Sequence, residues 1–293
     1  MNYLSIITLS VLSLAGCKHA EVTTDYMAAN PGVSQEEKGR QLLEASVRAM
    51  GYDQLRTIET YQADAVFDWR FPWGAMPMNP LPGAKNKKVR FRFLPNSFDG
   101  QVEYLEGRKQ GDTYGLQSWT YYQQQDGQYE ESRSPRREWA LATYHYLLEG
   151  PLRLLNADII RYAGQDEYNG TTYDLVFATW ESAEAHKEHD QWLLYLHPET
   201  KVVDLANVTI REYFLPFPRS LAEGTVLYQR EEHQSGIHFP TKMTIQLMTP
   251  KPEKKHVYTL QMSNYQVDTF GEQALRPLPG LKEYGDAKPS TER

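Results

Sequence analysis

The stretch Thr60–Arg70, TYQADAVFDWR, decides the fold of this chain. Apolar and polar residues alternate along it, and the polar set is dominated by Gln62, Asp64, Asp68 and Arg70. A period of two is the pattern of a strand with one buried face and one solvated face. The expected buried face consists of Tyr61, Ala63, Ala65, Phe67 and Trp69.

Further strand-like segments follow on both sides of this stretch. Residues 87–93 repeat the alternation, with Val89, Phe91 and Phe93 on the apolar side. No alternation of strands and helices interrupts the series, so the pattern predicts antiparallel pairing of about ten strands. A sheet of that length curls because strand twist accumulates. The other predicted strands are 101–106, 113–124, 159–163, 172–180, 191–197, 202–213, 224–232, 241–248 and 257–267.

Two principal helices are predicted beside the strands. The first has a Ser34-x-x-Glu37 capping box, an apolar stripe and a stop at Gly51. The second covers residues 136–155 and is interrupted near Gly150-Pro151. Their apolar faces need a partner, and the inside of a curved sheet offers one. The predicted fold is therefore mainly β (α+β), a single curved antiparallel sheet forming an open half-barrel with helices on its concave face.

The N-terminus has the features of an export signal. The first sixteen residues carry no charge, and the apolar run 3–14 is shorter than a membrane span of roughly 20 residues. Leu14-Ala15-Gly16-Cys17 resembles the lipobox of bacterial lipoproteins, in which the cysteine is acylated and becomes the new N-terminus. Cys17 is the single cysteine of the chain, and Lys18 follows it in place of the aspartate of inner-membrane retention. The resemblance implies a lipid anchor on Cys17 in the bacterial envelope, at the outer membrane. The alternative is an ordinary secretory signal followed by an accidental cysteine.

This organisation divides the chain into four parts. We expect a signal peptide at 1–16, a lipidated flexible tether at 17–33, one domain at 34–270 and a tail at 271–293. The formal net charge of −7 lies entirely in the mature part. An acidic body fits poorly to nucleic acid, which requires a clustered basic surface. The sequence therefore predicts a membrane partner and no nucleic-acid partner.

Three turns resemble segments of the LolA/LolB-like lipoprotein-localisation superfamily. Gly164–Gly170 leads into Tyr173 as in that family's turn before a strand, and Trp192–Thr200 ends in a similar proline turn with His197 in place of Asp. Gly236–Thr241 resembles a "Gly-Ile-x-Phe-Pro" strand entry found in related proteins. The resemblance implies a half-barrel with a helical lid whose apolar cavity receives acyl chains.

The search for catalytic chemistry yields one weak candidate. No common nucleophile, metalloprotease or nucleotide-binding motif occurs. His186 and His189 lie with Glu188 and Asp190 in a short hydrophilic segment, where two imidazoles and carboxylates are suitable zinc ligands. The alternative is a solvated hairpin tip, which the strong hydrophilicity favours. The prediction is no catalytic residue, no metal and no cofactor, with a metal-dependent hydrolase as the least favoured reading.

A ligand cavity is the favoured function. Phe67, Trp69, Phe91 and Phe93 face the predicted helices, and the long loop 71–84 contributes a rim or lid. Ordinary core packing is the alternative for the strand residues, and a loop folded over the core is the alternative for the lid. From the loop, the candidate lining residues are Phe71 and Trp73, with Met76 and Met78 beside them.

The preferred hypothesis is non-catalytic binding of a lipid or acylated molecule, in envelope lipid or lipoprotein handling. The alternative is a structural lipoprotein with a filled interior, which meets a protein partner through an exposed segment at Trp119–Tyr122.

Overall fold

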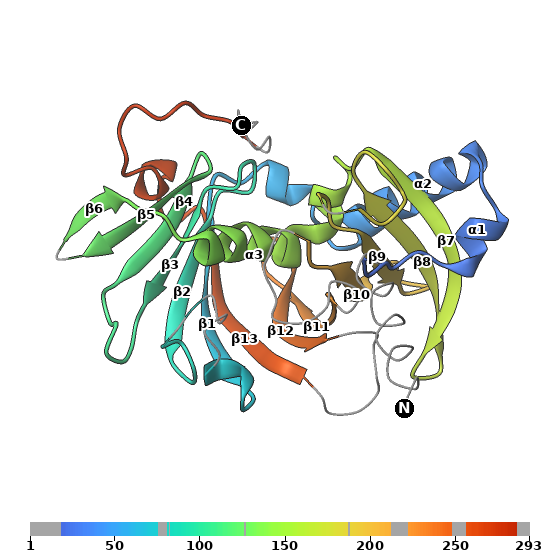
Figure 1. Cartoon of the computed structure of the whole chain (residues 1–293). Helices are drawn as coiled ribbons and strands as arrows, with labels where there is room; N and C mark the ends of the chain where they lie inside the picture. Colours follow the sequence, from blue (N-terminus) through green and yellow to red (C-terminus); the bar gives the residue numbers. More distant parts are fainter. Residues whose placement is uncertain are drawn as a thin grey trace, which may run out of the picture.

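One open antiparallel sheet forms the body of the protein in the computed structural model (Figure 1). The structure describes residues 19–75, 81, 83–125, 127–186, 188–211, 222–247 and 256–285, and within them the sheet has 13 strands. The strands are β1 (Tyr61–Trp69), β2 (Lys88–Phe93), β3 (Gly100–Tyr104), β4 (Thr113–Gln117), β5 (Thr120–Gln125), β6 (Gln128–Glu131), β7 (Ile159–Tyr168), β8 (Thr171–Thr179), β9 (Trp192–Leu196), β10 (Val203–Thr209), β11 (Glu223–Glu232), β12 (His238–Leu247) and β13 (His256–Val267).

The strand order is nearly the order of the chain. It runs β6-β5-β4-β3-β2-β1-β13-β12-β11-β10-β9-β8-β7, so the pair β1–β13 joins an N-terminal and a C-terminal half. Tyr61 pairs with Val267 and Trp69 with Tyr258 in this ladder. The mainly β class and the single antiparallel sheet are thus confirmed.

The predicted number of about ten strands is wrong, because the segment 113–124 contains two strands and β6 was not predicted. Ser118 and Trp119 turn the chain between β4 and β5 with φ of +48° and +63°. Such turns usually contain Asn-Gly or Asp-Gly, so this one carries no sequence signal. Here the carboxylate of Asp99 accepts a hydrogen bond from the backbone N–H of Ser118 at 2.6 Å.

Three α-helices are described: α1 (Asp25–Ala29), α2 (Val33–Ala49) and α3 (Pro135–Leu154). Short 3-10 turns lie at Gln54–Arg56, Trp73–Ala75 and Glu272–Leu275. The sheet bends around α3, while α1 and α2 lie beside its β7 edge (Figure 1). None of the helices in the described ranges combines the length and the apolar character that a membrane crossing requires.

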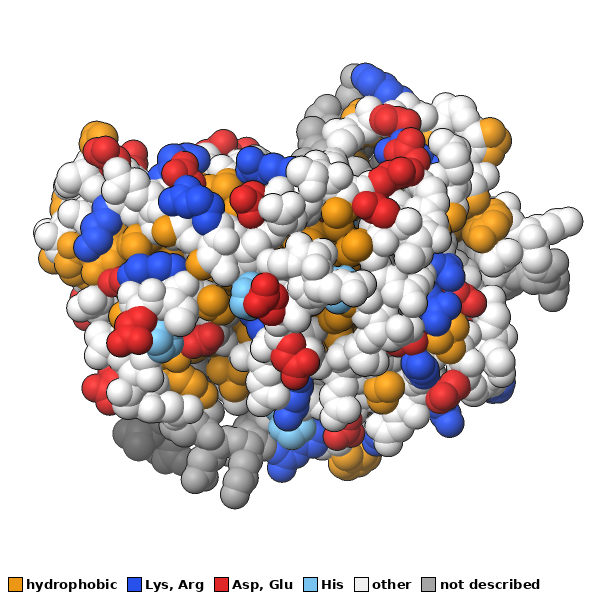
Figure 2. Space-filling model, turned by 180° about the vertical axis from the view of Figure 1, so that it is seen from behind, with side chains coloured by type: hydrophobic (Ala, Val, Ile, Leu, Met, Phe, Trp, Pro, Cys, Tyr) orange, Lys and Arg blue, Asp and Glu red, His pale blue; other side chains and the backbone are white. Residues whose placement is uncertain are grey.

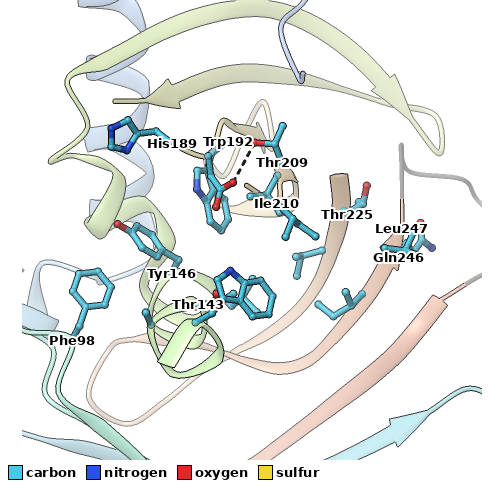
Figure 3. Close-up of a pocket in the computed structure, with 18 of the residues that line it drawn as sticks. Phe98, Thr143, Tyr146, His189, Trp192, Thr209, Ile210, Thr225, Gln246 and Leu247 are labelled. Carbon is cyan, nitrogen blue, oxygen red and sulfur yellow. Dashed lines mark hydrogen bonds between the residues drawn. The ribbon is translucent and has the colours of Figure 1, made fainter. Parts of the chain in front are cut away.

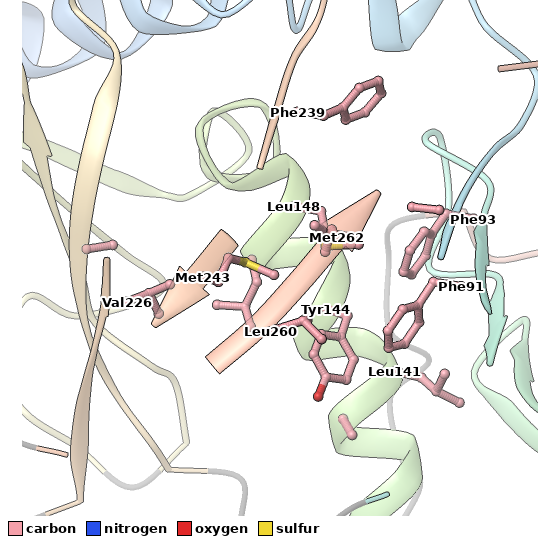
Figure 4. Packing of buried hydrophobic residues seen from close by; sticks show 14 of the residues in the cluster. Phe91, Phe93, Leu141, Tyr144, Leu148, Val226, Phe239, Met243, Leu260 and Met262 are labelled. Carbon is pink, nitrogen blue, oxygen red and sulfur yellow. The ribbon is translucent and has the colours of Figure 1, made fainter. Parts of the chain in front are cut away.

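The main core lies between α3 and the inner face of the sheet. Leu141, Tyr144 and Leu148 share one side of the helix and meet Phe91 and Phe93 of β2 (Figure 4). The five apolar residues of the alternating stretch, at 61, 63, 65, 67 and 69, are all buried and join this core, whereas Val66, Asp68 and Arg70 are exposed. The helix face and the strand face thus match as the two periodicities predict.

The start of α2 differs from the prediction, whereas its end agrees. Gly32 is the N-cap and no side chain caps the helix, so the expected Ser34–Glu37 box does not form. Gly51 has φ +64°, and the Tyr52 N–H donates to the Val47 carbonyl at 2.9 Å. This is the left-handed glycine stop that the sequence indicates.

The second helix continues through the predicted interruption. Pro151 lies inside α3, which reaches Leu154. A proline in a helix removes one backbone hydrogen bond, and tertiary contacts hold this turn instead. The Tyr52 hydroxyl donates to the Leu148 carbonyl at 2.7 Å, and the Arg153 guanidinium donates to the Ser97 carbonyl at 2.6 Å.

A buried polar network fixes the same half of α3 to the sheet. Glu149 accepts hydrogen bonds from the Tyr61 hydroxyl at 2.6 Å and from Arg153 Nε at 2.7 Å, and it lies 3.1 Å from His145 Nδ1. Burial alone would raise the pKa of Glu149, but Arg153 and then His145 outweigh it and hold this pKa below its usual value. Burial lowers the pKa of His145, against the effect of Glu149. Glu149 is therefore a carboxylate and His145 is neutral near pH 7.

Both chain ends that the structure describes lie against the sheet. Ala20 and Val22 are buried in residues 19–24, here called the N-terminal strap, and Val22 packs on the face of β7–β10 opposite to α3. The described part of the predicted tether thus contacts the body. Residues 271–285 of the expected tail also pack against the body. Leu275 is buried, and the backbone of Leu278 makes two hydrogen bonds of 2.8 Å with the Gln117 side chain. The predicted signal peptide and Cys17 lie outside the described residues.

Acidic and basic side chains are interspersed over the rear face of the molecule (Figure 2). Small groups of hydrophobic side chains separate them.

Candidate functional site

A cavity of about 420 Å³ lies between α3 and the ends of β9 to β13 (Figure 3). Its volume is within the range of roughly 300–1,000 Å³ found for small-molecule sites. The lining residues come from one side of α3, from strand ends and from three loops. They are Phe98, Trp119, Trp139, Ala142, Thr143, Tyr146, Leu147, Trp180, His189, Asp190, Trp192, Val208, Thr209, Ile210, Gly224, Thr225, Val226, Ile245, Gln246, Leu247 and Tyr258.

Aromatic rings form a continuous wall of this cavity. Four of the six tryptophans of the chain belong to the lining. The Tyr146 ring stands at the centre, 5.3 Å from the Phe98 ring, 5.9 Å from the Trp180 ring and 5.6 Å from the Trp192 ring. Phe98 in turn contacts Trp119 at 4.7 Å. Such a wall presents a large apolar surface with little conformational freedom to lose on binding.

The α3 side of the cavity follows from helical geometry. Trp139, Ala142, Thr143 and Tyr146 lie at spacings of three and four and therefore on one face of the helix. This face is distinct from the one that carries Tyr144 into the core. One helix therefore has two apolar sides, of which one is packed and one borders the cavity.

A few polar groups are placed at the strand ends. The Thr209 hydroxyl lies 3.4 Å from the carboxylate of Asp190 (Figure 3), and Asp190 also accepts from the Arg211 backbone N–H at 2.7 Å. The Thr225 hydroxyl donates to Asn207 at 2.8 Å. Burial raises the pKa of the Tyr258 hydroxyl to about 12, so this group is neutral. Val208 and Val226 belong to the core on the α3 side, so the neighbouring Thr209 and Thr225 side chains point to the opposite face of the sheet. The wall on the α3 side is therefore mostly apolar.

None of the six residues predicted to line a cavity belongs to this lining. Phe67, Phe91 and Phe93 are fully buried in the core, where Phe91 lies 4.8 Å from Tyr144. Trp69 is also buried, and its ring lies 4.3 Å from that of Tyr258, which does line the cavity. The strand residues thus take the core position that was their alternative.

The two loop candidates also lie outside the cavity lining. Trp73 is half-buried beside the core, and Phe71 is 81% exposed. Met76 and Met78 of the predicted lid lie outside the described residues.

The segment expected to be exposed at 119–122 is largely covered. Tyr121 and Tyr122 are buried, and Trp119 turns into the cavity wall. The reason is the turn at Ser118-Trp119, which folds β5 back onto β4 and brings both tyrosines into the sheet.

The histidine segment contributes to the cavity border. His189 lines the cavity, its Nε2 lies 3.1 Å from Glu181, and its ring lies 5.3 Å from that of His186. Within the described ranges, no group of three or more His, Cys, Asp or Glu side chains is placed to hold a metal ion.

Sequence reasoning missed the lining because it followed strand alternation. The available signal was a second stripe on the predicted helix at 136–155, where Trp139, Thr143 and Tyr146 recur at helical spacing. Trp180 and Trp192 lie at the ends of β8 and β9, and only the sheet register brings them opposite that stripe.

Comparison with solved structures finds bacterial proteins of similar fold. A DUF1329 family protein from Desulfovibrio piger matches with a TM-score of 0.53 and 12% identity over 82% of this chain and 97% of its own. A LolA superfamily protein from Nitrosomonas europaea matches at 0.48 and 12% identity, over 81% and 96%. A domain assigned to outer membrane lipoprotein sorting, from Vibrio parahaemolyticus, matches at 0.47 and 7%, over 80% and 97%.

The Nitrosomonas europaea structure is named for the LolA superfamily, whose turns this sequence resembles. No known protein family and no characterised protein sequence matches the chain. The likeness to the Desulfovibrio piger protein establishes the fold.

Proposed function

We propose that this chain is a bacterial envelope lipoprotein whose cavity binds a lipid acyl chain, or an acylated molecule, without chemical conversion. The observation that carries the proposal is the cavity of about 420 Å³ with its wall of Phe98, Tyr146, Trp180 and Trp192. Apolar walls with a few fixed polar groups are typical of sites that bind apolar ligands and orient one end of them. Thr143 of α3 and His189 border the same cavity and supply such groups for the polar end of the ligand.

The expected affinity follows from burial of methylene groups. Each buried methylene contributes about 0.8 kcal/mol, so ten of them supply about 8 kcal/mol. A free energy of about 8 kcal/mol corresponds to a dissociation constant near 1 μM. The site therefore has no need of a charged ligand to reach a useful affinity.

The N-terminal processing belongs to the same proposal. Residues 1–16 act as a signal peptide, Cys17 receives the lipid, and the half-barrel domain extends over 34–270. The support is the Leu14-Ala15-Gly16-Cys17 sequence and the absence of another cysteine from the chain. The lipid on Cys17 places the body at the outer membrane.

The test begins with protein expressed in its own envelope and purified with its native ligand. Mass spectrometry of the intact chain measures the acylation of Cys17, and extraction identifies any lipid that accompanies the body. The decisive variant is Ala142→Phe, which extends a ring from α3 into the cavity. Ala29→Phe on the exposed end of α1 is the matched control, since it adds the same ring outside the cavity.

We expect Ala142→Phe to lower the affinity for a fluorescent fatty acid at least tenfold, which corresponds to about 1.4 kcal/mol. Its stability should stay equal or rise, because filling a cavity commonly adds about 0.5–2 kcal/mol. Equal binding by the native chain and by Ala142→Phe would show that the ligand does not occupy this cavity. A stoichiometric protein partner recovered without any lipid would favour the structural alternative.

A further inference from the structure

The cavity lies at one defined end of the sheet. Strand registers pair Trp69 with Tyr258, Tyr258 with Ile245, and Gly224 with Leu247. The same end continues through Thr209 paired with Glu223, and through Val208 paired with Trp192. Five consecutive interfaces thus align the end of β1 with the cavity-lining ends of β9 to β13. The loop that begins at Arg70 leaves the sheet at this end.

The N-terminal strap is bonded to the rim of the same cavity. The Ala20 carbonyl accepts a hydrogen bond from the Arg211 side chain, and the Val22 N–H donates to the Gln191 side chain at 3.2 Å. The backbone N–H of Gln191 donates to the hydroxyl of Thr209 at 2.8 Å, and Thr209 is a lining residue. The strap and the cavity therefore share one hydrogen-bonded cluster.

This attachment limits how far the anchor lies from the cavity. Cys17 precedes Ala20 by three residues, and three extended residues span at most about 11 Å. A lipid on Cys17 therefore enters the bilayer close to the cavity rim. A freely jointed tether of 17 residues, the length predicted for 17–33, would spread over roughly 23 Å and fix no orientation.

The surface at this end of the sheet suits a lipid headgroup layer. Phe71 is 81% exposed directly after β1, and Trp73 is half-buried beside it. Arg70, Lys85 and Lys87 are exposed around them, although the chain as a whole is acidic. Aromatic rings favour the membrane interface, and basic side chains are attracted by anionic lipids at about 1 kcal/mol each.

We propose that the body stands on the bilayer with this end of the sheet, so that the cavity exchanges its ligand directly with the membrane that holds its own anchor. The inference rests on the proposed function, because it uses both the lipid on Cys17 and the acyl-binding cavity. The strap is the positioning element, and Phe71 with its basic neighbours is the contact surface. The ligand is a lipid taken from the same bilayer that holds the anchor on Cys17.

The test uses lipidated full-length protein in vesicles of phosphatidylethanolamine and phosphatidylglycerol. A phospholipid with a pyrene-labelled acyl chain is placed either in the protein's own vesicles or in separate ones. Energy transfer from the cavity tryptophans to pyrene reports loading, and Ala142→Phe supplies the background signal. One variant carries a 20-residue Gly-Ser insertion between Lys18 and His19. A second variant is Phe71→Ser, with Tyr129→Ser on the edge strand β6 as its matched control.

We expect the native protein to load faster from its own vesicles than from separate ones. The insertion and Phe71→Ser should each slow loading from its own vesicles about threefold or more, because the effective concentration of bilayer at the rim falls. Tyr129→Ser should load like the native chain. The final extent of loading should be unchanged in every one of these variants, since none alters the cavity.

The outcomes separate the two proposals. Equal rates for the native chain and the insertion variant, at normal final loading, overturn the direct exchange and leave the proposed function standing. No loading by the native chain from either set of vesicles overturns the proposed function, and the direct exchange with it.

Discussion

Replacement of Glu149 by glutamine tests the buried network that holds α3. In the native chain Glu149 neutralises Arg153, whose side chain is almost completely buried, and accepts from the Tyr61 hydroxyl. Glutamine has nearly the same shape, and its oxygen still accepts one hydrogen bond. Its amide group brings no charge, however, and presents donors toward Arg153, which is itself a donor only. The change therefore leaves a buried cation without its counter-ion.

The size of the effect follows from this geometry. Removing one partner of a buried ion pair costs about 3–5 kcal/mol, a large part of the roughly 5–15 kcal/mol that stabilises a typical protein. At about 2–4 °C for each kcal/mol in a chain of this size class, the melting temperature should fall by about 6–20 °C. The second replacement Arg153→Met, added to Glu149→Gln, should restore most of the loss because the unpaired cation is gone.

The measurement is urea unfolding followed by tryptophan fluorescence and by circular dichroism. Glu37→Gln is the matched control, since Glu37 is exposed on α2 and its loss should change stability by less than about 0.5 kcal/mol. A loss below about 1 kcal/mol for Glu149→Gln would refute the reasoning. So would a double variant that is less stable than the single one, because the unpaired charge would then not be the cause.

Two further predictions concern pH and helix packing. Because the folded pKa of His145 is lowered, the unfolded chain binds the extra proton first and stability falls as the pH drops below about 6.5. In the His145→Gln variant, the midpoint of urea unfolding should therefore depend less on pH between pH 6.5 and 5 than in the native chain. An equal pH dependence in the two proteins would contradict the reasoning. Gly39→Ala should destabilise by about 2 kcal/mol or more, although alanine normally stabilises a helix by about 1 kcal/mol, because its Cβ would lie 2.5 Å from the backbone of β7. A stabilised Gly39→Ala variant would disprove this close contact.

The sequence predicts those strands that have one buried face and one solvent-exposed face. The stretch 60–70 shows this clearly, since its apolar set lies in the core as expected. Strands β8 and β9 behave differently, because Phe177, Leu193 and Tyr195 pack on the opposite face to Val176 and Leu194. Strands that are buried on both faces have continuous apolar runs in the sequence. The sequence therefore predicted the two strands but not the second layer of side chains that packs on their other face.

The cavity was less predictable than the strands, because the residues that border it are far apart in the sequence. Tyr146 and Trp192 are 46 positions apart in the chain, and their rings meet only because β9 lies five positions from β1 in the final order. Local spacing carries no information about that register. The candidate lining residues chosen from the sequence were all aromatic, and the residues that border this cavity come from other positions.

The buried network explains why an apolar cavity can persist beside α3. Apolar walls tend to collapse onto one another, because the loss of contact across a void lowers stability. The helix is prevented from moving toward β10 and β11, since Glu149 and Arg153 bond it to Tyr61 of β1 and to the Ser97 carbonyl on the other side. A buried ion pair of this kind adds little stability compared with apolar packing, whereas its directional bonds fix position. The polar half of α3 thus sets the place of the helix, and the aromatic half then borders a space that packing alone would close.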